Sequence, residues 1–185
     1  MAKKLLDQVL VIDVEATCWE GPAPEGQESE IIEIGLCMLE IASGQRLEKC
    51  SLLVKPTRSE VSPFCTQLTT LTPEQVAQGI SFAEACAILQ TSYLAKERVW
   101  ASYGEYDRQI FEQQCHSQGV AYPFGTRHLN MKTLFALQHA LPREVGLAAA
   151  LRILNLPLEG IHHRGDDDAW NSALILSLLL RPQAS

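Results

Sequence analysis

Apolar residues in the N-terminal third of the chain come in near-continuous runs that predict buried β-strands. Residues 8–14 form the first run, which is too uniformly apolar for an exposed edge, so we expect a strand in the centre of a sheet. Residues 31–41 and 46–54 form two further runs around a Gly-containing turn, which predicts a hairpin. The intervening segment 20–30 is rich in Pro, Gly and Glu and predicts a mobile surface loop.

The rest of the chain alternates helical with strand patterns. Short helices are expected at 62–69 and 72–79, and Ser81 is expected to cap a helix with apolar positions at Phe82, Ala85, Cys86, Leu89, Tyr93 and Leu94. Strands are expected at 98–103 and 128–131, and helices at 105–118, 133–140, 146–154 and 166–180. This order predicts a single α/β domain over residues 1–185, with its core at about 8–180 and a mixed sheet flanked by helices.

Composition restricts the class of protein further. The 185 residues are 46% hydrophobic and 20% charged, which is typical of a globular domain that buries its own core. The net charge of -7 argues against a protein that coats nucleic acid through bulk electrostatics. Five basic residues against two acidic ones between 127 and 164 are nevertheless compatible with local binding of a polyanion.

The cysteines and the N-terminus indicate the compartment. The six cysteines form no CxxC pair, which argues against structural zinc, and we expect reduced thiols. Asp7 interrupts the apolar run after Lys3 and Lys4, so the signal-peptide pattern fails. The C-terminal run LILSLLL is too short to span a bilayer. We therefore expect a cytoplasmic protein without a membrane partner.

Two carboxylates interrupt the end of the first apolar run. Asp13 and Glu15 lie two residues apart, the repeat of a strand, so both project from one face. Divalent cations with oxygen ligands are the usual means of keeping such a pair ionised. The alternative is a strand end that emerges into solvent.

Further acidic positions follow later strands. Asp107 falls in the first turn of a predicted helix. A carboxylate at that position can bind a metal ion, but compensation of the helix dipole would explain it equally well. In HHRGDDDAWNSA, His163 precedes Asp168 by five residues across a loop-to-helix junction. The loop histidine can fold back over the carboxylate, although His162 and His163 could equally be exposed turn residues.

As a set, these residues resemble a known family. Asp13, Glu15, Asp107 and Asp168, with His163, match in type, order and spacing the DEDDh group of 3′-to-5′ exonucleases, which have a ribonuclease H-like fold. The blocks VIDVEATCWE, IIEIG, VSPFCTQLT, ASYGEYDRQ and HHRGDDDAWN resemble the Eri-type branch, which includes the histone-mRNA 3′ exonuclease and the bacterial sporulation-inhibitor-like exonucleases.

The resemblance implies roles for particular residues. The four acids would hold two divalent cations, Mg²⁺ or Mn²⁺, with Glu15 and His163 as catalytic residues and His163 as the general base. The backbone amides of Ala16 and Thr17 would face the terminal sugar. Phe64, Leu68 and Tyr106 would enclose the last base, with core packing as the alternative for Phe64 and Tyr106.

The expected activity is metal-dependent 3′-to-5′ hydrolysis of nucleic acid from a free 3′ end, releasing nucleoside 5′-monophosphates. The resemblance favours RNA over DNA, as a single strand or a 3′ overhang, and leaves the protein partners unknown. One alternative is a catalytically idle nucleic-acid-binding or adaptor domain, whose expected mark, loss of a ligand or of the histidine, is absent. Another is a DNA proofreading module.

Overall fold

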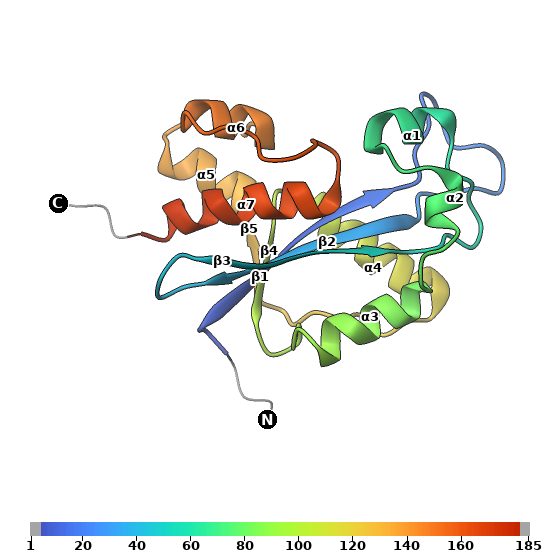
Figure 1. Ribbon diagram of the computed structural model, residues 1–185, viewed down its shortest axis with the longest axis horizontal. Helices are drawn as coiled ribbons and strands as arrows, with labels where there is room; N and C mark the ends of the chain where they lie inside the picture. Colours follow the sequence, from blue (N-terminus) through green and yellow to red (C-terminus); the bar gives the residue numbers. More distant parts are fainter. Residues whose placement is uncertain (1–4, 182–185) are drawn as a thin grey trace.

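A five-stranded mixed sheet forms the centre of the molecule. The computed structural model describes residues 5–181; Lys3, Lys4 and the other terminal residues of the expected 1–185 domain lie outside that range. The strands are β1 (Gln8–Ala16), β2 (Ile31–Glu40), β3 (Arg46–Leu53), β4 (Val99–Ser102) and β5 (His128–Asn130), in the order β3-β2-β1-β4-β5. β1 pairs antiparallel with β2 and parallel with β4, so the predicted central position of the first strand is confirmed (Figure 1).

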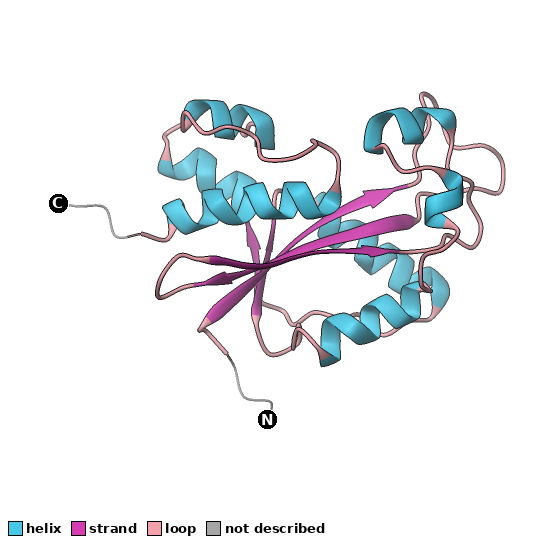
Figure 2. Cartoon of the chain, viewed as in Figure 1, coloured by secondary structure: helices cyan, strands magenta, loops and turns pink. Residues whose placement is uncertain are grey.

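Helices cover both faces of the sheet, as Figure 2 shows. α5 (Met131–Gln138), α6 (Leu147–Ile153) and α7 (Gly165–Leu179) pack on one face, and α3 (Phe82–Thr91) and α4 (Tyr106–Gln118) on the other. α1 (Pro63–Thr69) and α2 (Pro73–Val76) lie beside the end of β1 (Figure 1). This arrangement confirms the predicted α/β fold with a mixed sheet flanked by helices.

Alternation along β1 decides where its acidic side chains point. Leu10, Ile12 and Val14 belong to the core that includes α3 and α4. Val9 and Val11 belong to the core that includes α5, α6 and α7. Because side chains two residues apart share a face, the odd-numbered positions that follow Val11 also lie on the α7 face. Asp13 and Glu15 are therefore the last side chains of β1 on this face, close to the start of α7.

A contact between two glycines brings α7 close to the sheet. A Cβ atom at Gly35 in β2 would lie 1.7 Å from the carbonyl carbon of Gly165, the first residue of α7. Only a residue without a side chain fits there. Gly35 pairs with Asp13 across the β1–β2 ladder, so the close approach lies beside the acidic end of β1.

We expect Gly35→Ala to lower the free energy of unfolding by about 1–3 kcal/mol or more, because the added methyl forces α7 away from β2. Urea denaturation measures the change. Gly21→Ala is the matched control, since a Cβ at that exposed loop position meets nothing within 4 Å. Equal effects of the two substitutions would contradict the close packing.

Several element boundaries differ from the predictions: β1 continues to Ala16, α2 ends at Val76, and the limits of α3 and α5 also change. α3 ends at Thr91, so Tyr93 and Leu94 lie outside it, and Leu94 adopts a left-handed φ of 51°. α5 begins at Met131, two residues early, because the Asn130 side chain caps it by accepting from the Thr133 amide.

All six cysteines are free, as expected. Within residues 5–181, no helix has the length and apolarity needed to cross a membrane.

Candidate functional site

Three of the four predicted acids meet where β1 ends. Asp13 and Glu15 come from β1, and Asp168 comes from the first turn of α7. One carboxylate oxygen from each of the three lies within 4.8 Å of the others. Because α7 covers the odd-numbered face of β1, strand alternation and the position of the helix start together produce this cluster.

The fourth acid reaches the same place from the other side of the sheet. β4 runs parallel to β1, and α4 begins shortly after β4, so the start of α4 lies near the end of β1. The Asp107 side chain is 5% exposed, and its Oδ1 accepts a hydrogen bond of 3.0 Å from the Val14 amide. That bond fixes the carboxylate next to Asp13. Compensation of the helix dipole alone would not account for this contact.

Burial and mutual repulsion disfavour ionisation of these carboxylates. Burial, followed by the charges of Asp107 and Asp168, raises the pKa of Asp13 well above its ordinary value. Burial, followed by the charges of Asp168 and Glu33, raises the pKa of Glu15 to about 8, and burial raises that of Asp107 to about 6. Burial also raises the pKa of Asp168. Such a set fits a divalent cation, which prefers oxygen donors and relieves the repulsion.

These pKa shifts predict how the metal-free protein responds to pH. Carboxyl groups with a raised pKa keep protons in the folded state that the unfolded chain releases, so stability present at low pH is lost as the pH rises. For Glu15 the window runs from the ordinary pKa of 4.5 to the raised pKa of about 8. In EDTA, we expect Tm to fall by at least about 2–4 °C between about pH 5 and pH 8.

Differential scanning calorimetry measures this change, and saturating Mg²⁺ is expected to abolish it. Glu15→Gln is the matched variant, since an amide of the same size cannot titrate and should flatten the profile. Glu30 has the opposite effect on stability, because backbone and side-chain hydrogen bonds lower its pKa despite its burial. Its effect falls at pH values below this window. A Tm that rises steadily across the window would contradict the assignment.

The two histidines of the loop before α7 lie beside Asp168. The His163 amide donates to Asp168 Oδ2 at 2.9 Å, and its half-buried ring stacks on the His162 ring with centroids 4.0 Å apart. Burial and the neighbouring His162 lower the pKa of His163. The imidazole that contacts the carboxylate belongs to His162, whose Nδ1 lies 2.9 Å from Asp168 Oδ2. The structure thus gives His162 a contact that sequence reasoning did not assign.

Glu33 is a further acid that the sequence analysis missed. It pairs with Glu15 across the β1–β2 ladder and is fully buried. Two like charges side by side repel, and the charge of Glu33 contributes to the raised pKa of Glu15. The Arg164 guanidinium opposes this effect, donating to Glu33 through both Nε (3.2 Å) and an Nη atom (2.8 Å).

Glu33 also holds the start of α7. Its Oε2 accepts from the Gly165 amide at 2.8 Å, and its Oε1 accepts from the Ser51 hydroxyl at 2.5 Å. Since Gly165 lies between His163 and Asp168 in the chain, these bonds position both. The available signal was a single acid within the apolar run IIEIGLC.

The predicted base-enclosing residues lie at the surface. The exposed fractions of Phe64, Leu68 and Tyr106 are 38%, 37% and 54%, so the alternative of core packing is wrong. The helix that carries Phe64 and Leu68 is joined to the end of β1, because Ser62 donates to the Cys18 carbonyl at 2.6 Å. These apolar side chains are free to contact a ligand beside the acids.

The expectation for one backbone amide needs correction. The Thr17 amide donates to the Glu30 carbonyl at 2.8 Å, and the Thr17 side chain is fully buried and bonded to Glu28 and Glu30. An engaged amide is not available to a terminal sugar, so the predicted contact is wrong for the Thr17 amide. The buried Ala16 lies one residue closer to the acids, next to a register shift in β1.

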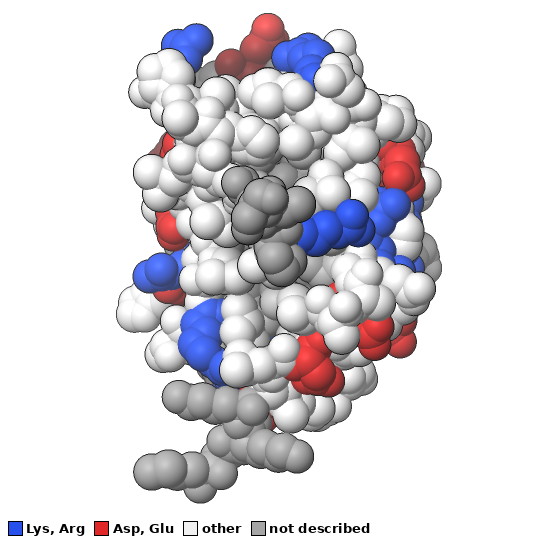
Figure 3. Space-filling model, turned by 90° about the vertical axis from the view of Figure 1, so that its left-hand side faces the viewer, with Lys and Arg blue, Asp and Glu red and all other residues white. Residues whose placement is uncertain are grey.

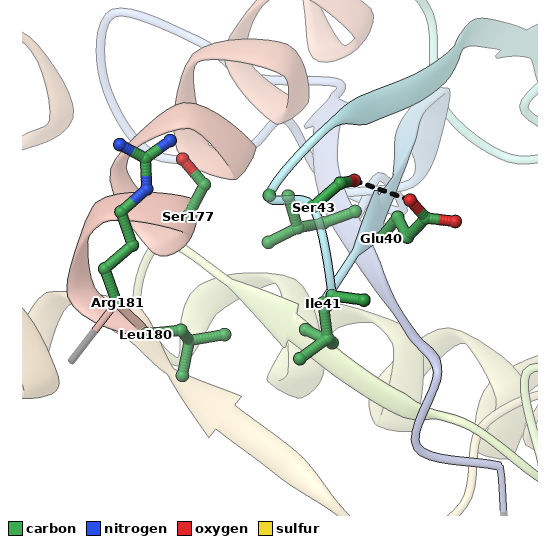
Figure 4. Close-up of a pocket in the computed structure, with 9 residues that line it drawn as sticks. Glu40, Ile41, Ser43, Ser177, Leu180 and Arg181 are labelled. Carbon is green, nitrogen blue, oxygen red and sulfur yellow. Dashed lines mark hydrogen bonds between the residues drawn. The ribbon is translucent and has the colours of Figure 1, made fainter.

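Among residues 5–181, the opposite end of the sheet offers no comparable site. The hollow there is lined by the β2–β3 turn and the end of α7, including Glu40, Ser43, Ser177 and Arg181 (Figure 4). The Ser43 hydroxyl donates to Glu40 Oε2 at 2.5 Å. Glu40 pairs with Gln8, so this hollow lies at the opposite end of β1 from the acids. On the described part of this end, Figure 3 shows basic and acidic side chains in small separate groups.

Comparison with known proteins agrees with this geometry. A family model described as Exonuclease (RNase_T) matches residues 10–176. The chain is similar to ERI1 exoribonuclease 2 of Homo sapiens, at 24% identity over 204 residues, and to 3′-5′ exoribonuclease 1 of Homo sapiens, at 27% over 191 residues. These matches cover 97% of this chain but 29% and 54% of the two relatives, so the chain spans about half or less of their length.

The fold has a counterpart among solved structures. The nuclease domain of 3′hExo, a DEDDh family member bound to rAMP, matches with a TM-score of 0.82 at 26% identity. The match covers 97% of this chain and 94% of that domain. The likeness confirms the predicted ribonuclease H-like architecture over nearly the whole chain.

Proposed function

The chain belongs to the Exonuclease (RNase_T) family, and from this premise we propose that it is a metal-dependent 3′-to-5′ exonuclease that releases nucleoside 5′-monophosphates. The observation that carries the proposal is the meeting of four separated acids at the end of β1, with His163 beside one of them. An idle binding domain has no need of carboxylates that raise one another's pKa, because such groups destabilise the ionised site.

The proposed metal ligands are the carboxylates of Asp13, Glu15, Asp107 and Asp168, which would hold two divalent cations, Mg²⁺ or Mn²⁺. The all-oxygen donor set supports this choice, since hard cations prefer carboxylates. When bound, such a pair lowers the pKa of water and offsets the charge that develops on the phosphodiester oxygens. The Glu33–Arg164 pair keeps the fifth carboxylate of this region compensated and holds α7 in place.

His163 is the proposed proton acceptor. Its lowered pKa keeps the imidazole neutral near neutral pH, which is the form that accepts a proton from an attacking water. The bond from its amide to Asp168 and the stacking on His162 limit where the ring can move. The proton would then leave to solvent, because His163 is only half-buried.

The proposed substrate is RNA with a free 3′ end. Tyr106, Phe64 and Leu68 offer exposed apolar surface on which a terminal base can stack without being read. The preference for RNA is supported by the two human relatives, which are named exoribonucleases. A contact to the 2′-hydroxyl is what distinguishes RNA from DNA at such a site.

The test offers the purified chain a 5′-labelled RNA and a DNA of the same sequence, with and without Mg²⁺. Each strand is supplied with a free and with a chemically blocked 3′ end. We expect progressive shortening of the free-ended RNA with Mg²⁺, nucleoside 5′-monophosphates as products, and slower shortening of the DNA.

The other outcomes point to different functions. Fragments from the blocked strand would indicate an endonuclease, and faster hydrolysis of DNA would favour the proofreading alternative. Binding of either strand without any product in Mg²⁺ or Mn²⁺ would indicate an idle binding domain.

A further inference from the structure

The loop before α7 places two imidazoles against one carboxylate. His162 Nδ1 lies 2.9 Å and 3.1 Å from the two carboxylate oxygens of Asp168. The His163 ring stacks on the His162 ring at 4.0 Å, with 22° between their planes. One potential ligand atom from each of His162, His163 and Asp168 lies within 4.8 Å of the others. This group shares only Asp168 with the cluster of Asp13, Glu15 and Asp168.

The donor types of the two groups favour different cations. Carboxylate oxygens alone suit Mg²⁺ and Mn²⁺, whereas two imidazole nitrogens and a carboxylate are a typical set for Zn²⁺. Zinc binds these donors at about 2.0–2.2 Å, so two ligand atoms in a tetrahedral site lie roughly 3.3 Å apart. His162 and Asp168 already lie within that separation. A ring nitrogen of His163 lies within 4.8 Å of both ligand atoms, and its ring has to turn out of the stack on His162 before its lone pair can point at the same cation.

We propose that His162, His163 and Asp168 form a site for Zn²⁺ or a similar borderline transition-metal cation. The side chain of His162 is 38% exposed, so a cation can reach the site from solvent. A cation bound there occupies the Asp168 carboxylate and the His163 lone pair, with which His163 would otherwise accept a proton. The consequence that zinc inhibits the enzyme rests on the proposed function, because it assumes that His163 accepts a proton there.

The backbone of the loop also supports the site. His163 has a left-handed φ of 66° and its amide is bonded to Asp168, so the backbone holds both rings over the first turn of α7. The ligands therefore come from one short loop and one helical turn.

Zinc affinity of the purified chain, measured without nucleic acid by competition with a colorimetric zinc indicator, tests the proposal. We expect His162→Ala to weaken binding at least about tenfold, because even residues around a metal ligand contribute that much. His116→Ala is the matched control, since this exposed histidine of α4 lies outside the cluster, and it should bind as the wild type does. His162→Gln, which keeps a polar side chain, replaces the alanine variant if that variant fails to fold.

Absorption spectra of the Co²⁺-substituted chain identify the ligands, which matters because the chain has six free cysteines. We expect a spectrum without thiolate charge transfer that changes in His162→Ala. Equal zinc affinities of wild type and His162→Ala, or a thiolate spectrum, would overturn the site.

The inhibitory consequence has its own readout. Zinc added to the Mg²⁺-loaded chain is expected to slow RNA shortening at concentrations that fill the site, and His162→Ala should require about tenfold more zinc relative to its own zinc-free rate. A wild type that shortens RNA unimpeded with the site filled would overturn the inhibition. A chain with no nuclease activity would remove the proposed function and this consequence, while the titration still decides the zinc site.

Discussion

Asp13→Asn is expected to lower Mg²⁺-dependent shortening of RNA by about 10³-fold or more while leaving the chain folded. The amide keeps the size of the side chain but loses the charge at the centre of the carboxylate cluster, where Asp107, Asp168 and Glu15 all act on it. A loss of several kcal/mol of electrostatic stabilisation in the transition state corresponds to a rate effect of this size. Asp168→Asn should have a similar effect, since Asp168 belongs to the same cluster.

Stability distinguishes this loss of activity from unfolding. Because burial and like charges oppose ionisation of Asp13, removing its charge should raise the Tm of the metal-free protein near pH 8. Asp7→Asn is the matched control: the same change at this exposed residue just before β1 should leave the rate unaltered. Full activity of Asp13→Asn in Mg²⁺ would remove the carboxylates from the mechanism.

His163→Ala is expected to lower kcat by about 10²–10⁴-fold with KM and Mg²⁺ affinity little changed. The range is that of a positioned general base, and the ring lies beside Asp168 without a hydrogen bond to that carboxylate among the described contacts. Steady-state kinetics over pH check the role. The wild-type rate should fall as His163 is protonated below its lowered pKa, and the variant should lose this acidic limb.

His116→Ala, an exposed histidine of α4, is the control and should retain the wild-type pH profile. If His162→Ala rather than His163→Ala removed the acidic limb, the base would be His162, whose ring contacts Asp168 directly. A loss of Mg²⁺ affinity in His163→Ala without a change in the pH profile would indicate a structural role for the residue.

Local patterns predicted much of this structure because each depends on neighbours in sequence. The uniformly apolar run at 8–14 indicated a central strand, and the capping box at Thr72 confirms that a helix starts where the one expected at 72–79 was placed. Alternation placed Asp13 and Glu15 on one face before any tertiary contact was known. The patterns failed where the chain turns: Tyr93 and Leu94 continue the apolar spacing of α3, yet the helix ends at Thr91.

Those patterns could not predict contacts between segments that are far apart in the sequence. The bond from the Val14 amide to Asp107 spans 93 positions, and the Glu33–Arg164 pair spans 131. The engagement of the Thr17 amide by Glu30 could not be foreseen either, because it depends on how the loop 17–30 returns to β2.

The sequence by itself determined which residue types are available, which of them share a strand face, and that they match the DEDDh pattern. Only the tertiary structure decided that Glu33 joins the acids, that Arg164 compensates it, and that the ring of His162 contacts Asp168 whereas His163 contacts it through its backbone amide. The physical reason is that alternation and helical periodicity arise from local backbone geometry. Electrostatic balance arises instead from distances between segments, which are set only when α7 packs on β2 through Gly35 and Gly165.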